Sequence, residues 1–317
     1  MHALVLDATT FTLTERPTPS PGAHEVLVDV AATGLNAADL LQRRGLYPAP
    51  AGWPRDIPGL ELAGTVAAVG EYVDASLIGS RVCAIVGGGA FASQALVPAA
   101  HLIPVPEAAS DVEAGGFAEA FLTAFDALVV QADLRAGERV LISGAAGGVG
   151  TAAVQIARLL GAHVIAVSRH SEHEPTLRAL GADEVITPEA VADLAPVQVL
   201  LELVGAANLE RAQHRLAPFA RVVIIGIGGG ATAQLNLLSL MGTRARLTGS
   251  TLRARSHDEK AGLCALVREQ LLPVWADGTL RVPVATMFDV AAVDDAFDFF
   301  ARPGKLGKVI LTYGSLA

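Results

Sequence analysis

Residues Val140–Gly150 read VLISGAAGGVG, an apolar stretch that runs directly into a cluster of glycines. The residues that follow predict a helix, because one face of it would be apolar, formed by Val149, Ala152, Ala153, Ile156, Ala157 and Leu160. A strand, a glycine turn and a helix N-terminus together favour a phosphate group, because bare N–H groups and the positive end of the helix dipole face it. We therefore expect Ala145, Gly147, Gly148 and Val149 to bind a diphosphate, and Gly150 to let the helix pack closely on the sheet.

Apolar strands alternate with helical stretches after Glu119, which predicts a doubly wound parallel α/β sheet. The expected strands are Arg139–Ser143, His163–Ser168, Glu184–Ile186, Val197–Leu203, Arg221–Ile225 and Ala245–Gly249. In this context the GxxGxxG pattern from Gly144 indicates a dinucleotide, and a flexible turn without a ligand is the weaker alternative. Residues 119–255 therefore form the predicted Rossmann dinucleotide-binding domain.

The first part of the chain predicts a small, curled, β-rich domain. Its expected strands are Ala3–Asp7, Glu25–Ala32, Leu62–Val69 and Arg81–Val86, separated by glycine turns. The tail predicts a helix from about His257, a strand at Val284–Val290, a helix at Val293–Phe300 and a strand at Gly307–Thr312. We expect this tail to return to the first domain, so that residues 1–118 and 256–317 form one domain.

Composition and charge exclude several classes of partner. The formal net charge is −9 and no basic run occurs, which argues against nucleic acid and anionic membranes. Val222–Gly242 lacks charges over a membrane-spanning length, but its GIGGG run and polar residues predict a strand, a loop and a short helix. Cys83 and Cys264 form no ligand-like or disulfide pattern, and MHALVLDATTF lacks the basic region of a signal peptide, so we expect a cytoplasmic protein.

The end of the second expected strand bears on the choice of dinucleotide. NAD-binding folds usually carry a carboxylate there, whereas this chain has Ser168-Arg169-His170. A hydroxyl and a guanidinium suit a 2′-phosphate, which favours NADPH and leaves NADH possible. The alternative is that Arg169 is an ordinary solvated side chain.

Several stretches together resemble a known family. They are GLNAADLLQRRGLYPAP (34–50), PGLELAGTVAAVG (58–70), GGGAFASQALVPAAHLIPVPE (87–107), AEAFLTAF (118–125), LTGSTLRAR (247–255) and GKLGKVIL (304–311). In this order they resemble the zinc-independent, zeta-crystallin-like quinone oxidoreductases of the medium-chain dehydrogenase/reductase superfamily. The resemblance implies a Rossmann domain beside a GroES-like catalytic domain. A Lys and a Tyr that the family uses for the adenosine phosphate are absent from SRHSEHEP and ITPEAV.

The resemblance also implies site residues. Catalytic roles fall on Asn36, Tyr47 and Thr123, and further cofactor contacts fall on Gly226, Ile227, Ser250, Thr251 and Leu252. From the residues alone, Asn36 could instead cap the following helix, Asp39 could do the same or face solvent, and Tyr47 could be loop packing.

Zinc-dependent members of the superfamily would place a Cys at Asn36 and a His at Leu60, leaving only Glu61 as a ligand. One carboxylate does not hold zinc, so we predict no metal. The pair His170 and His173 lacks a third ligand nearby, and we expect a solvated loop there.

The leading hypothesis is hydride transfer from NADPH to a quinone, an enone or another conjugated carbonyl compound. An enoyl or alkenal reductase is the alternative, and a non-catalytic, crystallin-like or regulatory NADPH-binding protein is a third. We also expect a homodimer, because the strand at Ala245–Gly249 would be the edge of the sheet.

Overall fold

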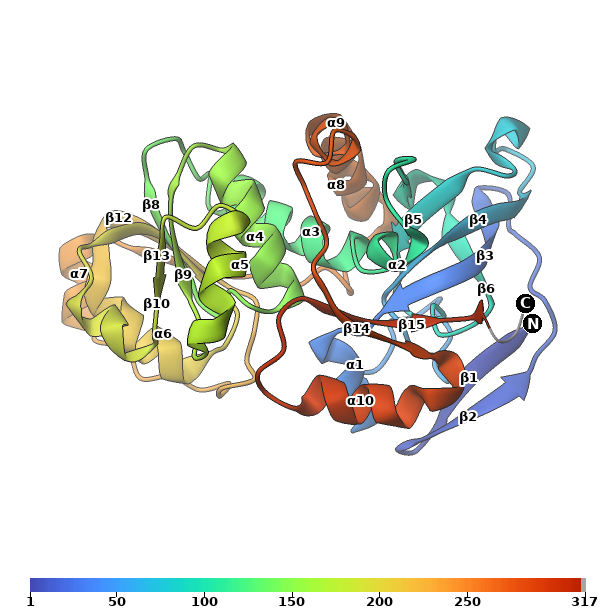
Figure 1. Cartoon of the computed structure of the whole chain (residues 1–317), viewed down its shortest axis with the longest axis horizontal. Coiled ribbons are helices and arrows are strands. Elements are labelled where there is room, and N and C mark those ends of the chain that lie inside the picture. Colours follow the sequence, from blue (N-terminus) through green and yellow to red (C-terminus); the bar gives the residue numbers. More distant parts are fainter. Residues whose placement is uncertain (315–317) are drawn as a thin grey trace. The chain divides into compact units, whose positions relative to one another are not determined.

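The computed structural model describes residues 1–314, which fold into two compact units. One unit contains Met1–Leu122 and the chain from Leu252 onward, and the other is Thr123–Thr251. Figure 1 shows the chain coloured along the sequence, with the sheet of the second unit running from green to orange.

The second unit is built on a six-stranded parallel sheet of order β10-β9-β8-β11-β12-β13. Its strands are β8 (Arg139–Ile142), β9 (His163–Val167), β10 (Glu184–Ile186), β11 (Val197–Glu202), β12 (Leu216–Ile224) and β13 (Arg246–Gly249). The strand order reverses between β8 and β11, and ligands of such sheets bind at the carboxyl ends of the strands at this reversal. The predicted doubly wound sheet is confirmed, with β13 as its last strand.

Helices connect these strands: α4 (Gly148–Leu159), α5 (Glu174–Ala179), α6 (Ala206–Ala212) and α7 (Leu237–Thr243). The interior is apolar, and Leu141, Ile165 and Leu200 are almost completely buried. Val222–Gly242 divides between the end of β12, a glycine-rich turn and most of α7. Within residues 1–314, no helix has both the length and the apolar character needed to span a membrane.

The first unit contains a seven-stranded, mainly antiparallel sheet of order β14-β15-β3-β4-β5-β7, with β6 also paired to β3. Its strands are β3 (Glu25–Gly34), β4 (Glu61–Val69), β5 (Arg81–Ile85), β6 (Gln94–Pro98), β7 (Leu102–Pro104), β14 (Val284–Asp289) and β15 (Lys308–Thr312), and β1 (His2–Asp7) and β2 (Thr10–Glu15) form a separate hairpin. Register shifts along β3 and β4 help the sheet curl. The predicted β-rich fold is confirmed, but β2, β6 and β7 were not among the predicted strands.

Helices of this unit are short except for α8. They are α1 (Ala37–Arg43), α2 (Asp111–Ala114), α8 (His257–Gln270), α9 (Leu272–Ala276) and α10 (Val293–Ala301), and α3 (Ala118–Phe125) carries the chain from one unit into the other. Ser256 and Glu259 start α8 with reciprocal hydrogen bonds, a capping box. Figure 1 shows the C-terminal strands β14 and β15, in red, beside β3 in blue, so that the tail completes the sheet.

Candidate active site

Two glycines near the start of α4, Gly150 and Gly147, have different roles. At Gly150 a Cβ atom would collide with the backbone oxygen of Gly144 and lie 2.6 Å from Ala145 Cα, so only glycine allows α4 to pack this closely on the turn after β8. At Gly147, the N-cap of α4, a Cβ would meet only Gly144 O, at 3.5 Å. The backbone of Gly147 is therefore bare on its outer side, which leaves room for a phosphate at the helix N-terminus.

Ser168 lies directly after β9, and its hydroxyl organises the turn that follows. Ser168 Oγ lies 3.1 Å from His170 O, 3.3 Å from His170 N and 3.1 Å from His173 Nδ1. His173 is only 6% exposed, so the prediction of a solvated loop at His170 and His173 is wrong for His173. The side chain of Arg169, by contrast, is exposed.

Glu202, which the sequence reasoning missed, ends β11 at the reversal of strand order. Its Oε1 accepts hydrogen bonds from Ser143 Oγ (2.6 Å), Val204 N (2.7 Å) and Gly205 N (2.7 Å). Its Oε2 is buried and has no hydrogen-bond partner within residues 1–314. Burial therefore raises the pKa of Glu202. A carboxylate within the apolar run VQVLLELVG was the available signal.

The remaining predicted cofactor residues of the second unit follow the carboxyl ends of β12 and β13. The N–H of Gly226 donates to Glu202 O (3.1 Å), and Ile227 is 51% exposed. Ser250 donates from its backbone to Ile224 O (3.0 Å) and from its hydroxyl to Asp126 Oδ2 (2.8 Å). Because all strands of this sheet are parallel, these residues lie on the same edge as Gly147 and Ser168. Thr251 follows Ser250 and is exposed, and Thr123 in α3 is buried.

In the first unit, a buried ion pair lies beside Asn36. Lys308 Nζ donates to Glu61 Oε1 (2.6 Å), Asn36 Oδ1 (2.8 Å) and Leu35 O (3.0 Å). Asn36 Nδ2 donates to Glu61 Oε1 (3.0 Å) and Gly34 O (3.1 Å), and Glu61 Oε2 accepts from the N–H of Glu119 (2.8 Å). Both N–H groups of the Asn36 amide are therefore engaged within the protein, and neither remains for another acceptor.

Asn36 is also the N-cap of α1, where its backbone N–H donates to Asp39 Oδ2 (2.8 Å). Asp39 is 1% exposed, and its Oδ1 has no hydrogen-bond partner among the described residues. Burial raises the pKa of Asp39 to about 7, opposed by its bond to Asn36 and by the charges of Arg253 and Lys308. Burial, with the negative charge of Glu61, likewise raises the pKa of Glu119 to about 8. Two protonatable carboxyls thus lie beside one buried ion pair.

Tyr47 lies in the loop after α1 and is half-buried. Its hydroxyl makes no hydrogen bond with any part of the chain that the structure describes, so the phenol remains a potential donor. Burial raises the pKa of Tyr47, the positive charge of Arg253 opposes this, and Glu119 adds to it. The remaining predicted residue, Leu252, is buried at the start of the C-terminal segment of this unit.

Comparison with known proteins places the chain in a family. Residues 22–107 match the family described as alcohol dehydrogenase GroES-like domain, and residues 148–269 match the family described as zinc-binding dehydrogenase. The quinone oxidoreductase of Lama guanicoe is 30% identical over 92% of this chain and 90% of its own length. The chain belongs to the medium-chain dehydrogenase/reductase superfamily. This confirms the resemblance to the quinone oxidoreductases that the sequence analysis identified.

Two further relatives show the range of this superfamily. The quinone oxidoreductase of Thermus thermophilus, with a crystal structure described in complex with NADPH, is 34% identical, with a TM-score of 0.86 over 98% of this chain and 100% of that one. A phenolphthiocerol/phthiocerol polyketide synthase of Mycobacterium tuberculosis is 31% identical over 92% of this chain, which spans only 14% of that protein.

The description of the second matching family implies zinc. The residues at the expected zinc-ligand positions, Asn36, Leu60 and Glu61, do not fit this metal. Leu60 offers no ligand atom and is buried. Both oxygens of Glu61 accept hydrogen bonds, and the ammonium group of Lys308 lies 2.6 Å from one of them. Within residues 1–314 there is no group of three or more His, Cys, Asp or Glu side chains placed to hold a metal ion.

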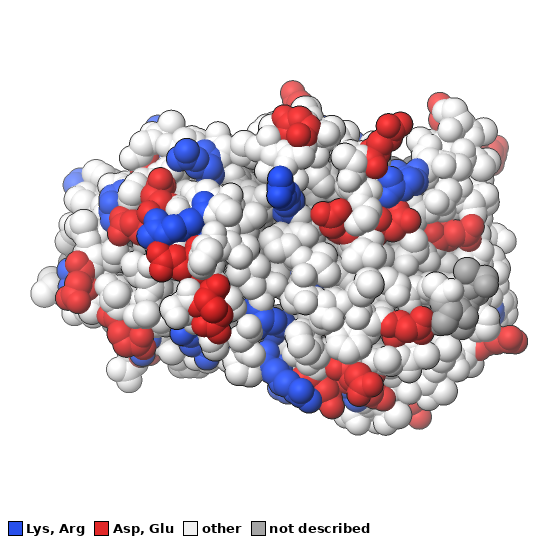
Figure 2. Space-filling view, viewed as in Figure 1, with Lys and Arg blue, Asp and Glu red and all other residues white. Residues whose placement is uncertain are grey.

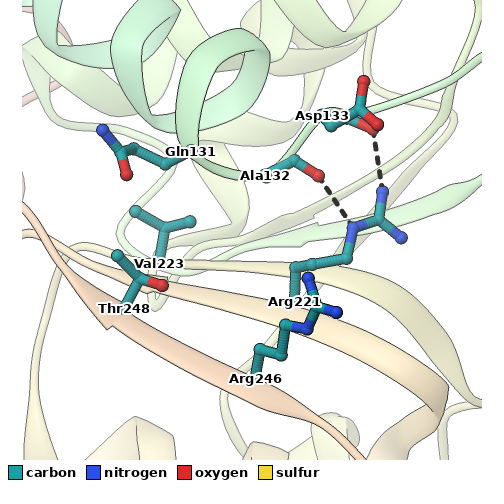
Figure 3. A pocket seen from close by; sticks show the side chains of 7 residues that line it. All are labelled: Gln131, Ala132, Asp133, Arg221, Val223, Arg246 and Thr248. Carbon is teal, nitrogen blue, oxygen red and sulfur yellow. Dashed lines mark hydrogen bonds between the residues drawn. The ribbon is translucent and has the colours of Figure 1, made fainter.

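A cavity of about 220 Å³ opens elsewhere in the second unit, against β12 and β13. Figure 3 shows the seven lining residues, with Arg221 donating to the backbone oxygens of Ala132 (2.7 Å) and Asp133 (3.0 Å). Arg221 is also paired with Glu138, at 2.6 Å. None of the lining residues is a predicted site residue, so this cavity is separate from the candidate cofactor site.

Proposed function

We propose that the protein is an oxidoreductase that binds a nicotinamide dinucleotide along the carboxyl edge of its parallel sheet, with NADPH preferred to NADH. The bare backbone of Gly147 at the N-terminus of α4 and the exposed guanidinium of Arg169 after β9 support this assignment. The NADPH complex described for the Thermus thermophilus relative supports it as well. When bound, this cofactor supplies a hydride.

Arg169 provides the test of the cofactor preference. Arg169→Ala removes the cation that we assign to the 2′-phosphate, so the dissociation constant for NADPH should rise about 10-fold, the loss of one charge-assisted hydrogen bond. The dissociation constant for NADH, which lacks that phosphate, should not change. Fluorescence titration with each nucleotide measures the two dissociation constants and their ratio. An unchanged NADPH/NADH ratio would show that Arg169 is an ordinary surface residue.

For the reaction, we propose metal-free reduction of a quinone or another conjugated carbonyl compound. Hydride addition to such an acceptor places negative charge on its carbonyl oxygen, which a hydrogen-bond donor stabilises, and solvent then supplies the proton. The observation that carries this proposal is the half-buried Tyr47 hydroxyl, a donor without a partner within residues 1–314. Since both Asn36 N–H groups are engaged, we assign Asn36 to holding the site together. Thr123 remains a proposed contact to the acceptor or the nicotinamide.

An assay of NADPH oxidation tests this reaction, with naphthoquinone, phenanthrenequinone and an enoyl thioester as acceptors. We expect turnover of the quinones. Tyr47→Phe should lower kcat by about 100-fold, as for the loss of one oxyanion donor, and leave the dissociation constant for NADPH unchanged. Wild-type rates in Tyr47→Phe would remove Tyr47 from the mechanism. NADPH binding without turnover of any acceptor would instead support the non-catalytic alternative.

Enoyl or alkenal reduction is the second candidate, and the polyketide synthase relative favours it. A conjugated enoyl thioester, like an enone, accepts a hydride at the carbon β to its carbonyl group. Turnover of the thioester alone in the assay above would establish this candidate in place of quinone reduction.

The remaining proposals concern partners and location. We propose a homodimer, because β13 has an unpaired edge in the described sheet and α7 beside β12 exposes Leu237, Leu238 and Met241. Sedimentation equilibrium distinguishes this dimer from a monomer.

On the face drawn in Figure 2, Lys and Arg are interspersed with Asp and Glu, which supports a small-molecule substrate over nucleic acid. A cytoplasmic location also remains a proposal, suggested by the two free cysteines, Cys83 and Cys264.

A further inference from the structure

Arg253 is a buried arginine whose side chain joins two separate segments of the first unit, α1 with its following loop and the loop after β5. It is 5% exposed, and all of its side-chain nitrogens donate. Nε donates to Gly87 O (2.9 Å), Nη1 to Tyr47 O (2.8 Å) and Nη2 to Gln42 Oε1 (2.5 Å). These acceptors belong to the loop after β5, the loop after α1, and α1 itself. All three are neutral oxygens, so no carboxylate within residues 1–314 cancels the charge of Arg253 through a hydrogen bond.

The same guanidinium lies over the ring of Tyr47, with its central carbon 5.0 Å from the ring centroid. A cation in this position is attracted by the face of the ring and restricts its orientation. Arg253 thus contacts Tyr47 twice, through the backbone oxygen and through the ring. The charged groups that act on this pair are Asp39, Glu119 and Lys260.

A second buried cation fixes the backbone of Arg253. Lys260 in α8 is 2% exposed, and its Nζ donates to Arg253 O at 2.9 Å. Lys260 also lies 5.8 Å from the ring centroid of Trp53, which stacks on His257 with centroids 5.7 Å apart. The loop that carries Tyr47 and the segment that carries Arg253 are therefore connected at several points.

We propose that Arg253 is a positioning residue for Tyr47, fixing its loop and ring and holding a positive charge beside its phenol. The proposal rests on the proposed function for the role of Tyr47 in turnover. Its electrostatic part is independent of any reaction, because a nearby cation stabilises the phenolate and lowers the pKa of Tyr47. Arg253→Met removes the charge and all three hydrogen bonds, whereas Arg253→Lys keeps the charge.

The first experiment needs no activity. Tyrosinate absorbance is titrated with alkali in the wild type, in Arg253→Met and in Arg253→Lys, with Tyr47→Phe subtracted to isolate the signal of Tyr47. The pKa of Tyr47 should rise in Arg253→Met and move less in Arg253→Lys. An unchanged pKa in Arg253→Met, with the folded state verified by circular dichroism, would overturn the electrostatic part of the proposal.

The second experiment measures kcat and KM with the quinone that the wild type turns over, together with NADPH affinity. We expect Arg253→Met to lower kcat about 10- to 100-fold, as for a misplaced donor, with NADPH affinity unchanged. Arg253→Lys should recover part of kcat. Arg268→Met is the matched control, because Arg268 also donates to backbone oxygens of this unit, those of Ala100 and Leu102, without contacting Tyr47.

The outcomes separate this proposal from the proposed function. An equal loss of kcat in Arg253→Met and Arg268→Met, or wild-type kcat in Arg253→Met, would overturn positioning by Arg253. Absence of turnover in the wild type would overturn the proposed function, and the tyrosinate titration would still decide whether Arg253 acts on Tyr47.

Discussion

Among single residues, Asp39 is one whose charge differs between the folded and the unfolded protein below neutral pH. Its carboxyl is buried in α1, and burial raises its pKa from the ordinary value of 3.8 to about 7. Between these two values the folded protein holds a proton that the unfolded chain has released. The free energy of unfolding therefore falls as pH rises from about 4 to about 7, by up to about 1.4 kcal/mol per pH unit for one proton.

Asp39→Asn should remove this loss of stability. The amide oxygen of Asn can still accept the N–H of Asn36, so the cap is retained while the ionisable group is lost. The free energy of unfolding, measured with urea across this pH range, should decline less steeply with rising pH in Asp39→Asn than in the wild type. The control is Asp277→Asn, because Asp277 is exposed and Thr279 lowers its pKa. Equal declines in the wild type and Asp39→Asn would show that Asp39 ionises normally in the folded protein.

The sequence predicted the local structure around a residue where a single segment sets that structure. The glycines of the β8–α4 turn are such a case, because strand, turn and helix are contiguous. The ion pair of Glu61 and Lys308 could not be predicted in this way, since its partners are 247 residues apart and meet only when the tail joins the sheet. Arg253 was missed for the same reason, although it lies within a stretch that resembles the family.

At the scale of elements, two glycines near the start of α4 allow the effect on stability and the effect on cofactor binding to be measured separately. Gly150→Ala should destabilise the protein by about 1–3 kcal/mol, because the new Cβ meets backbone atoms of Gly144 and Ala145 that cannot move away alone. Gly147→Ala is the matched variant, since its Cβ meets only one atom at 3.5 Å. It should cost less than about 1 kcal/mol yet weaken NADPH binding about 10-fold by filling space that we assign to the diphosphate.

Thermal unfolding and NADPH titration of both glycine variants measure these two effects. If Gly147→Ala binds NADPH as tightly as the wild type does, the diphosphate does not approach this turn. If Gly150→Ala unfolds at the wild-type temperature, α4 packs less closely on β8 than the structure shows.

Elements that belong to the repeating strand–helix pattern were predictable, whereas three strands of the first unit were not. The six strands of the parallel sheet follow from short, largely apolar stretches that alternate with helical ones, and α4 follows from its apolar face. β12 begins at Leu216, earlier than the expected Arg221, and its first residues, LAPFA, include a proline, which is uncommon inside strands. The strands β6 and β7 are five and three residues long and pair with β3 and β5, which lie earlier in the chain, whereas β2 pairs with β1 in a hairpin.

At the scale of the whole molecule, a Rossmann unit and a β-rich GroES-like unit occur in one chain of the medium-chain dehydrogenase/reductase superfamily. The first unit contains a half-buried phenol beside a buried arginine, and the second contains a glycine turn at the reversal of its strand order. Superfamily membership follows from the comparisons, whereas the acceptor remains a proposal that rests on local side chains such as Tyr47. This is why quinone and enoyl acceptors both belong in the assay.

Isothermal titration calorimetry of the purified protein tests the central claim, that the Rossmann unit binds a nicotinamide dinucleotide. We expect saturable binding of one NADPH per chain, tighter than that of NADH. The absence of binding heat for both nucleotides at millimolar concentration would contradict it.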